Sequence, residues 1–372
     1  MFALDIVLIL GLIYWPRRDS ILWTVGGVVL LSGIGLFGIA LFSVIFRMNR
    51  GQCAVEGMTY HGSLFLLLAG GFLFYRKRRF PAVLSALCGV FVFGIGFNML
   101  VWEPYSLVVE RYSFETPKLT KPLRIVFVAD IQTDRIGEYE RRTLRMIQEQ
   151  KPDLILFGGD YLQYYEGTPG VAALPERFRQ LFEEAELSAP LGVFAIPGNN
   201  DPSSSEEFSK LFAGTMVEPI FFSEIIEDLG SDIELGPIDI SFLHVSHSID
   251  GVGERGLTET GNFQIMIGHY PNFAVRDYMH SERAPDLMLA GHTHGGQIYV
   301  PGFGPLRINF TGRDAVTPAS MYHGMFAFEN GSRLLVTRGT GMERGWAPRV
   351  RFLCKPEICV IDINPSPEIG NR

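Results

Sequence analysis

A glycine-rich turn near residue 292 holds the side chains best suited to chemistry. The turn Gly291–Gln297 reads Gly-His-Thr-His-Gly-Gly-Gln and directly follows the apolar run Asp286–Ala290. We expect a strand that leads into this turn and aims both imidazoles outward, while the flanking glycines let the backbone approach a ligand closely. Two imidazoles so placed are good metal ligands. Two surface histidines would give the same local pattern, so the rest of a site must come from elsewhere.

Four other segments also place polar residues directly after a predicted strand. They are Asp130-Ile131-Gln132 after Leu123–Ala129, Gly158-Gly159-Asp160 after Leu154–Phe157, Gly198–Asp201 after Gly192–Ile196, and Gly268-His269 after Phe263–Ile267. Open α/β sheets build their sites at the carboxyl ends of strands, so these side chains can converge. Two Asp, one Asn and three His suit a pair of divalent metal ions with one carboxylate bridging them.

The remaining elements predict a layered α/β sandwich with mixed sheets. Strands alternate with helices first and dominate later, which is typical of that class. We expect further strands at Ile238–Val245, Gly324–Phe328, Leu334–Thr337 and Glu357–Ile363, and helices at Tyr139–Gln150 and Pro175–Ala185. Ser203–Gly230 is interpreted as an insertion with a short helix, whose apolar residues are expected to pack in the core, with capping of a site or contact with lipid as the alternatives.

The five motifs, taken in order, resemble those of the calcineurin-like metallophosphoesterases. They are closest to the membrane-associated bacterial branch that includes YkuE-like proteins. The resemblance covers Leu123 to Ile363, and the combination is highly specific although each motif alone is weak. It implies an α/β/β/α sandwich and a hydrolase that acts on phosphoester or pyrophosphate bonds.

The same resemblance implies a ligand set for two divalent metal ions. One ion would be held by Asp130, Gln132, Asp160 and His294, and the other by Asp160, Asn199, His269 and His292. Asp160 would bridge the two ions, and a hydroxide between them would attack phosphorus. Mn²⁺ is the first expectation for the metals, with Fe, Zn and Mg as alternatives.

Two positions depart from the family pattern, because Gln132 and Asn200 stand where the family usually has histidine. The harder amide oxygen of Gln132 favours Mn²⁺ or Mg²⁺ over Zn²⁺. Asn200, the expected catalytic residue, can contact phosphate but cannot donate a proton near neutral pH. General acid catalysis is worth about 10²–10⁴-fold, so we expect pyrophosphate or aryl esters to be preferred over alkyl phosphodiesters. His244 and His247 either replace the missing acid or form a strand-end pair.

The first hundred residues predict a membrane region. Ile21–Phe46 and Pro81–Trp102 are apolar runs long enough to cross a bilayer. Phe2–Trp15 and Thr59–Tyr75 are shorter and are either spans or interfacial segments, which makes about four helices in all. Arg17-Arg18 follows Phe2–Trp15, and Arg76–Arg79 follows Thr59–Tyr75. These basic segments are expected to be cytoplasmic, which places the catalytic domain on the outer face of the cytoplasmic (inner) membrane.

Charge divides along the same boundary. Residues 1–104 hold eight of the 32 Lys/Arg and four of the 40 Asp/Glu, which leaves 24 basic and 36 acidic residues, a net charge of −12, for the rest. Such an acidic domain is poorly suited to nucleic acid, because phosphate contacts need basic surface. It favours a phosphorylated small molecule or lipid whose phosphate is bound through metal.

We therefore expect a transmembrane region at 1–104, a linker with an edge strand at 105–122, and a metallophosphoesterase domain at 123–372. The expected function is membrane-anchored phosphohydrolysis, with a lipid-linked phosphate as the favoured substrate. The alternative is a degenerate binding or regulatory module, which only Gln132 and Asn200 support. Cys354 and Cys359 are expected to be ordinary thiols, with a short disulfide loop as the alternative.

Overall fold

The computed structural model describes residues 50–163, 171–222, 224–229, 235, 237–242, 261–271, 278–305, 321–343 and 347–366. The chain divides into two compact units. One unit comprises Met1–Glu103 with Arg344–Phe352, and the other comprises Pro104–Glu343 with Leu353–Arg372.

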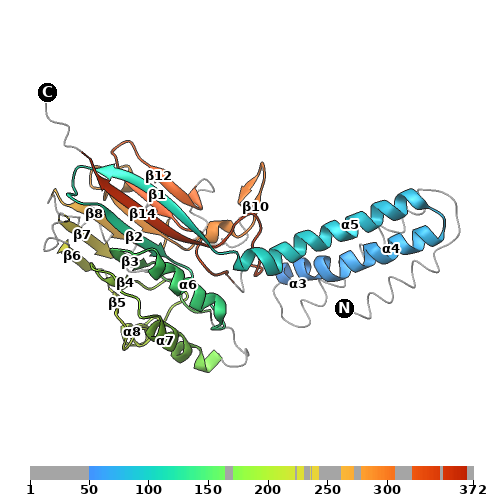
Figure 1. Cartoon of the computed structure of the whole chain (residues 1–372), viewed down its shortest axis with the longest axis horizontal. Helices are drawn as coiled ribbons and strands as arrows, with labels where there is room; N and C mark the ends of the chain where they lie inside the picture. Colours follow the sequence, from blue (N-terminus) through green and yellow to red (C-terminus); the bar gives the residue numbers. More distant parts are fainter. Residues whose placement is uncertain are drawn as a thin grey trace. The chain divides into compact units, whose positions relative to one another are not determined.

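The first unit contains a pair of long apolar helices (Figure 1). Helix segments α3, η1 and α4 form one, and α5, η2 and η3 form the other. Their bounds are α3 (Arg50–Glu56), η1 (Gly57–Gly62), α4 (Ser63–Tyr75), α5 (Arg79–Phe97), η2 (Asn98–Trp102) and η3 (Glu103–Tyr105). By length and composition alone, Gly51–Tyr75 and Arg79–Tyr105 could each cross a membrane. The predicted runs Phe2–Trp15 and Ile21–Phe46 lie outside the described residues.

Glycines let α4 and α5 approach each other closely. A Cβ on Gly70 would lie 2.9 Å from the carbonyl oxygen of Ala82, and one on Gly89 would lie 2.9 Å from that of Ser63. Small residues at helix contacts are typical of helices that pack within a bilayer. The outward faces of the pair are apolar as well, because Phe91, among others, is 67% exposed. Such a surface is costly in water, which favours a lipid environment.

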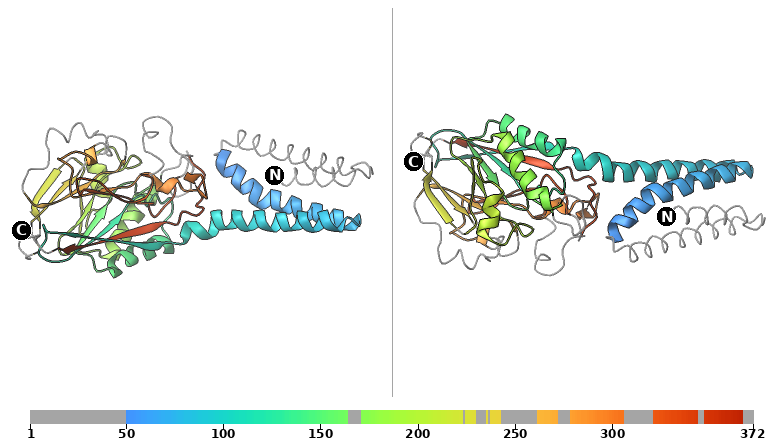
Figure 2. Two further views of the ribbon diagram at one scale, coloured as in Figure 1. Left: turned by 90° about the horizontal axis from the view of Figure 1, so that it is seen from above. Right: turned by 90° about the horizontal axis from the view of Figure 1, so that it is seen from below.

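The second unit is a sandwich of two six-stranded sheets with a small hairpin (Figures 1 and 2). The first sheet has the order β1 (Val108–Thr116), β14 (Glu357–Pro365), β2 (Leu123–Val128), β3 (Leu154–Phe157), β4 (Val193–Ala195) and β5 (Val217–Pro219). The second has the order β12 (Gly324–Ala327), β13 (Arg333–Val336), β9 (Leu287–Ala290), β8 (Phe263–Ile267), β7 (Ile238–Phe242) and β6 (Glu224–Leu229). The hairpin pairs β10 (Tyr299–Val300) with β11 (Gly304–Pro305).

Strand alternation builds the layers. In β2, Ile125 and Phe127 point into the core shared with the second sheet, whereas Val126 and Val128 point to the other face. That other face packs against α6 (Glu138–Glu149), α7 (Leu174–Ala185) and α8 (Ser205–Lys210), which lie along one side of the first sheet in Figure 1. A third cluster, which contains Met266, Met279 and Met288, covers the outer face of the second sheet. The mixed sheets and layers confirm the predicted α/β sandwich.

One predicted feature of the fold is wrong. Ser203–Gly230 is not an insertion, because β5 pairs with β4 in the first sheet and β6 pairs with β7 in the second. The segment therefore supplies an edge strand to each sheet. Its short helix α8 is present, and Phe208, Leu211 and Phe212 pack in the core as expected, while Phe222 is 66% exposed.

Parallel pairing brings the predicted site segments to one edge of each sheet. Val128 at the end of β2 pairs with Phe157 at the end of β3, which pairs in turn with Ala195 at the end of β4. In the second sheet, Ile267 at the end of β8 pairs with Leu289 in β9. The turns that follow these five strands carry all the predicted metal ligands.

Candidate metal centre

The predicted ligands lie on strongly bent backbone at the strand ends. Five of them have φ in the left-handed region: Asp130 at 52°, Gln132 at 34°, Asp160 at 59°, His292 at 69° and His294 at 48°. Such angles are uncommon for residues with side chains, and each costs on the order of 1–3 kcal/mol. Strain of this kind persists where the surrounding structure holds it, and it gathers at functional sites.

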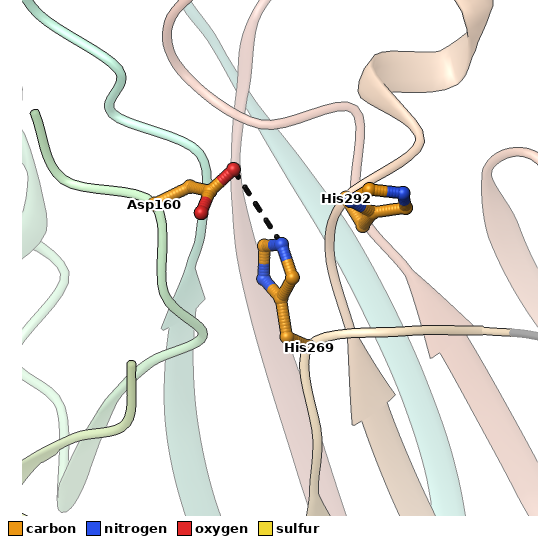
Figure 3. A group of neighbouring side chains, drawn as sticks. All are labelled: Asp160, His269 and His292. Atoms are coloured by element: carbon orange, nitrogen blue, oxygen red, sulfur yellow. Dashed lines mark ion pairs between the residues drawn. The ribbon is translucent and has the colours of Figure 1, made fainter. Parts of the chain in front are cut away.

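Asp160, His269 and His292 form the centre of the site (Figure 3). One ligand atom from each of the three lies within 4.8 Å of those from the other two. His269 Nε2 is 3.5 Å from Asp160 Oδ2. Asp160 and His269 are buried, while His292 is half-buried. Three segments that are far apart in the chain thus meet in one group of donor atoms for a metal ion.

A backbone contact orients the His269 ring. Nδ1 lies 2.8 Å from the carbonyl oxygen of Gly158, which can only accept, so Nδ1 carries the hydrogen and donates it. Nε2 then faces Asn199 Oδ1 at 3.0 Å and Asp160 Oδ2 at 3.5 Å. A nitrogen lone pair that faces two oxygens needs a positive charge between them, which either a second proton or a metal ion supplies.

The pKa values of this group follow from the same crowding. Burial acts to lower the pKa of His269, but the attraction of Asp160 and a hydrogen bond to it outweigh burial and raise the pKa to about 9. Burial also acts to raise the pKa of Asp160, yet the His269 charge holds that pKa well below its usual range. Burial and repulsion from His269 lower the pKa of His292 to about 3. His292 is therefore a neutral imidazole, the form that ligates metal.

Asp130 and His294 lie on the other side of the site. Both side chains are buried, and His294 Nε2 is 4.0 Å from Asp130 Oδ1. The backbone N–H of His292 donates to both Asp130 carboxylate oxygens, at 3.1 and 2.9 Å. The turn after β9 is thus fixed to the end of β2, and one nitrogen and one carboxylate are placed together there.

Two carboxamides surround the Asp160 carboxylate. Gln132 Nε2 and Asn200 Nδ2 each donate to Asp160 Oδ2 at 2.8 Å, and the Asn200 backbone N–H donates to Oδ1 at 2.8 Å. Asn200 is half-buried and Asn199 is exposed, so solvent reaches the site from this side. The structure brings Asn200 beside the predicted ligands, and its side chain is aligned by Asp160.

Other candidates have structural roles or cannot be placed. Asp201 accepts hydrogen bonds from the backbone N–H groups of Asp160, Tyr161 and Gly198, so it holds the two turns together. His280 is exposed and packs edge-on against Phe328. His244 and His247 lie outside the described residues.

Neither of the two C-terminal cysteines forms a disulfide, and both are buried thiols, as expected. Cys354 Sγ donates to the carbonyl oxygen of His294 at 3.3 Å, so this thiol supports the histidine turn.

Sequence reasoning missed two residues of the site, Tyr270 and Glu343. Tyr270 stacks edge-on with His292, with ring centroids 4.4 Å apart. Glu343 is buried and accepts from Gln132 and from Gln163. Glu343 follows β13, which runs parallel to β9, so its place in a glycine-rich loop after a parallel strand was the available signal.

The donor set fits divalent cations. Asp160, Asn199, His269 and His292 offer oxygen and nitrogen atoms that converge where only positive charge is favourable. Gln132 Oε1 is buried and makes no hydrogen bond within the described part of the chain. A buried amide oxygen without a hydrogen bond costs about 1–3 kcal/mol of stability, which coordination to a cation would offset.

The chain matches the family model of the calcineurin-like phosphoesterases over residues 123–296. It is 32% identical to the uncharacterized metallophosphoesterase YkuE of Bacillus subtilis, over 78% of this chain and 98% of YkuE. It is 28% identical to the phosphodiesterase YaeI of Escherichia coli, over 77% of this chain and 98% of YaeI. It is 26% identical to the UDP-2,3-diacylglucosamine pyrophosphatase LpxG of Chlamydia trachomatis, over 70% of this chain and 90% of LpxG.

A mixed two-sheet sandwich with acidic, amide and imidazole side chains at the strand ends defines a metal-dependent phosphoester hydrolase. The chain belongs to the calcineurin-like phosphoesterase family, whose members use divalent metals.

Proposed function

We propose that this protein is a membrane-anchored phosphohydrolase that works with two divalent metal ions, Mn²⁺ first among them. The convergence of Asn199 Oδ1 and Asp160 Oδ2 on His269 Nε2 is the observation that carries the proposal. His292, Asn199 and His269 would hold one ion, Asp130, His294 and Gln132 would hold the other, and Asp160 would serve both. The bound ions would supply charge for the phosphoryl oxygens and lower the pKa of water.

The residues of the chain have distinct parts in this reaction. Gly158 holds the His269 ring through its Nδ1, so that Nε2 stays directed at the site. Asn200 lies half-buried beside Asp160, where its amide could contact a phosphoryl oxygen. An amide does not donate a proton to the leaving group. We therefore propose that substrates with stable leaving groups, pyrophosphates and aryl esters, react faster than alkyl diesters.

A lipid-linked phosphate is the substrate class we propose. The exposed apolar faces of the α4–α5 helix pair would tether the domain to a bilayer. LpxG, a relative over most of its length, is named as a pyrophosphatase of a UDP-linked diacylglucosamine. The domain itself is acidic, so phosphate binding would depend on the metal ions rather than on basic side chains.

The test uses the full chain in detergent, stripped of metal and then supplied with Mn²⁺, Mg²⁺ or Zn²⁺. The substrates are bis(4-nitrophenyl) phosphate and a nucleoside diphosphate lipid. We expect turnover that requires metal, and we expect His292→Ala to abolish it, while His280→Ala, an exposed histidine outside the site, leaves it unchanged. No metal-dependent turnover on either substrate would instead support a binding module that uses the same fold.

We also propose that the domain lies on the outer face of the membrane. Arg17-Arg18 and Arg76–Arg79 are the basic segments on which this orientation rests. A reporter fused after Arg372, active only outside or only inside the cell, tests it directly. An inner location would contradict the orientation and would suit a nucleotide-linked lipid made in the cytoplasm.

A further inference from the structure

Glu343 is a buried carboxylate at the edge of the site that has no place in the predicted ligand set. Its side chain belongs to a residue that is 9% exposed. The backbone N–H of Glu343 donates to Gln297 Oε1 at 2.5 Å, in the histidine turn after β9. Oε1 accepts from Gln163 Nε2 at 3.0 Å, and Oε2 accepts from Gln132 Nε2 at 3.1 Å. The backbone of Glu343 is therefore fixed by Gln297, and its carboxylate is held between the amides of Gln163 and Gln132.

The contact decides which end of the Gln132 carboxamide is available. The two ends of an amide have nearly the same shape, and only their partners distinguish oxygen from nitrogen. Nε2 of Gln132 lies 2.8 Å from Asp160 Oδ2 and 3.1 Å from Glu343 Oε2, so two carboxylates take its two hydrogens. An amide oxygen in the same place would face two negative charges. The reversed orientation is thus strongly disfavoured.

The oxygen that remains is suited to a cation. Gln132 Oε1 is buried and makes no hydrogen bond to the described residues. If Asp160 were the only carboxylate acceptor, one N–H of the Gln132 amide would have no carboxylate partner. Glu343 supplies the second anchor.

We propose that Glu343 is a positioning residue that presents the Gln132 oxygen, rather than its nitrogen, to the metal ion. The inference rests on the proposed function, since it concerns the same metal centre. Carboxylates that orient a metal ligand through a hydrogen bond typically change metal affinity by about 10–100-fold. Glu343 gives this chain such a carboxylate for an amide ligand.

The test measures Mn²⁺ binding to the full chain in detergent rather than turnover. Bound Mn per chain is measured by elemental analysis after gel filtration, and the Kd is measured by electron paramagnetic resonance titration. Glu343→Gln keeps the volume but replaces one acceptor with an N–H donor. We expect it to weaken Mn²⁺ binding at one of the two positions by about tenfold or more. Glu140→Gln is the matched control, because Glu140 also accepts two hydrogen bonds but lies outside the site.

A second background separates positioning from a general structural effect. If Glu343 acts through Gln132, then Glu343→Gln should change the Kd less than about twofold in a chain that already carries Gln132→Ala. Equal weakening in both backgrounds, or no weakening in the wild-type background, would overturn the inference. If Glu343→Gln does not fold, Glu343→Asp takes its place, because it keeps the charge but withdraws it from Gln132. Weaker Mn²⁺ binding only in the background that retains Gln132 would support the inference, and equal or absent weakening would overturn it. A wild-type chain that binds no Mn²⁺ would refute the proposed function itself.

Discussion

Gly198 offers a direct steric test of the site, because it has no room for a side chain. A Cβ at this position would lie 2.1 Å from Asp160 Oδ1 and 2.5 Å from the Asp160 backbone nitrogen. Ordinary carbon–oxygen contacts begin at about 3.3 Å, so the Asp160 carboxylate must move by about 1.2 Å. The φ of Gly198 lies outside the left-handed region, so Gly198→Ala changes the site through this contact and not through backbone strain.

The expected loss follows from that displacement. A misplacement of about 1 Å at a reacting centre can reduce the rate about 10²-fold. Overpacking of this kind also destabilises a fold by about 1–3 kcal/mol. We therefore expect Gly198→Ala to lower kcat/KM on an aryl diester by about 100-fold and to reduce bound Mn²⁺.

The assay is metal-dependent hydrolysis of bis(4-nitrophenyl) phosphate, together with metal content and thermal unfolding. Gly137→Ala is the control, because a Cβ there would meet only Glu140 Oε2, at 3.5 Å. Gly137 is the N-cap residue of α6, so we expect Gly137→Ala to change the free energy of unfolding by less than about 1 kcal/mol and to leave turnover intact. A Gly198→Ala chain with turnover and metal content within about twofold of wild type would refute the role assigned to Asp160.

Two further substitutions test the leaving-group argument and the contribution of a buried ion pair to stability. Asn200→His restores a proton donor, so we expect the ratio of alkyl to aryl diester kcat/KM to rise by about 10²-fold, and an unchanged ratio would count against the argument. Arg338→Met leaves the buried Glu357 carboxylate without its 2.5 Å ion pair, and we expect the free energy of unfolding to fall by about 3–5 kcal/mol in chemical denaturation. Arg179→Met, which breaks exposed ion pairs, should change stability little, and equal effects of the two substitutions would contradict this account.

The strands of the core were predictable because they are buried on both faces. β3 and β8 match the predicted runs Leu154–Phe157 and Phe263–Ile267 residue for residue. β3 is apolar throughout and β8 has a single polar residue, Gln264, at its one half-buried position; the burial of nearly every position explains why neither strand shows polar alternation.

The edge strands were not predictable from local pattern. β5, Val217–Pro219, is three residues long and ends in proline, and β6, Glu224–Leu229, is largely exposed and acidic. Charge and proline are common on edge strands, where they discourage further pairing. Neither segment has a sequence pattern that indicates a strand. Each becomes a strand because it pairs with its neighbour, β5 with β4 and β6 with β7.

The residue types and order of the site motifs were sufficient to bring Asp160, His269 and His292 together in prediction, and the structure places their ligand atoms within 4.8 Å of one another. The roles of individual ligands stay predictions. Glu343 could not be found in this way, because it belongs to no motif of the five. Its contact with Gln132 spans 211 residues of sequence and depends on the geometry of the loop after β13.

The two positions that depart from the family pattern share one hydrogen-bond partner, the Asp160 carboxylate. Gln132 and Asn200 both donate to Asp160 Oδ2, the oxygen that also faces His269. The two amides and His269 together surround this oxygen. A cation bound to His269 Nε2 and to this oxygen would share the oxygen with both amide donors. Imidazole nitrogens in their neutral form could instead turn a lone pair toward the ion. We therefore expect the two amides to give the centre a lower affinity for metal than imidazoles at the same positions would give.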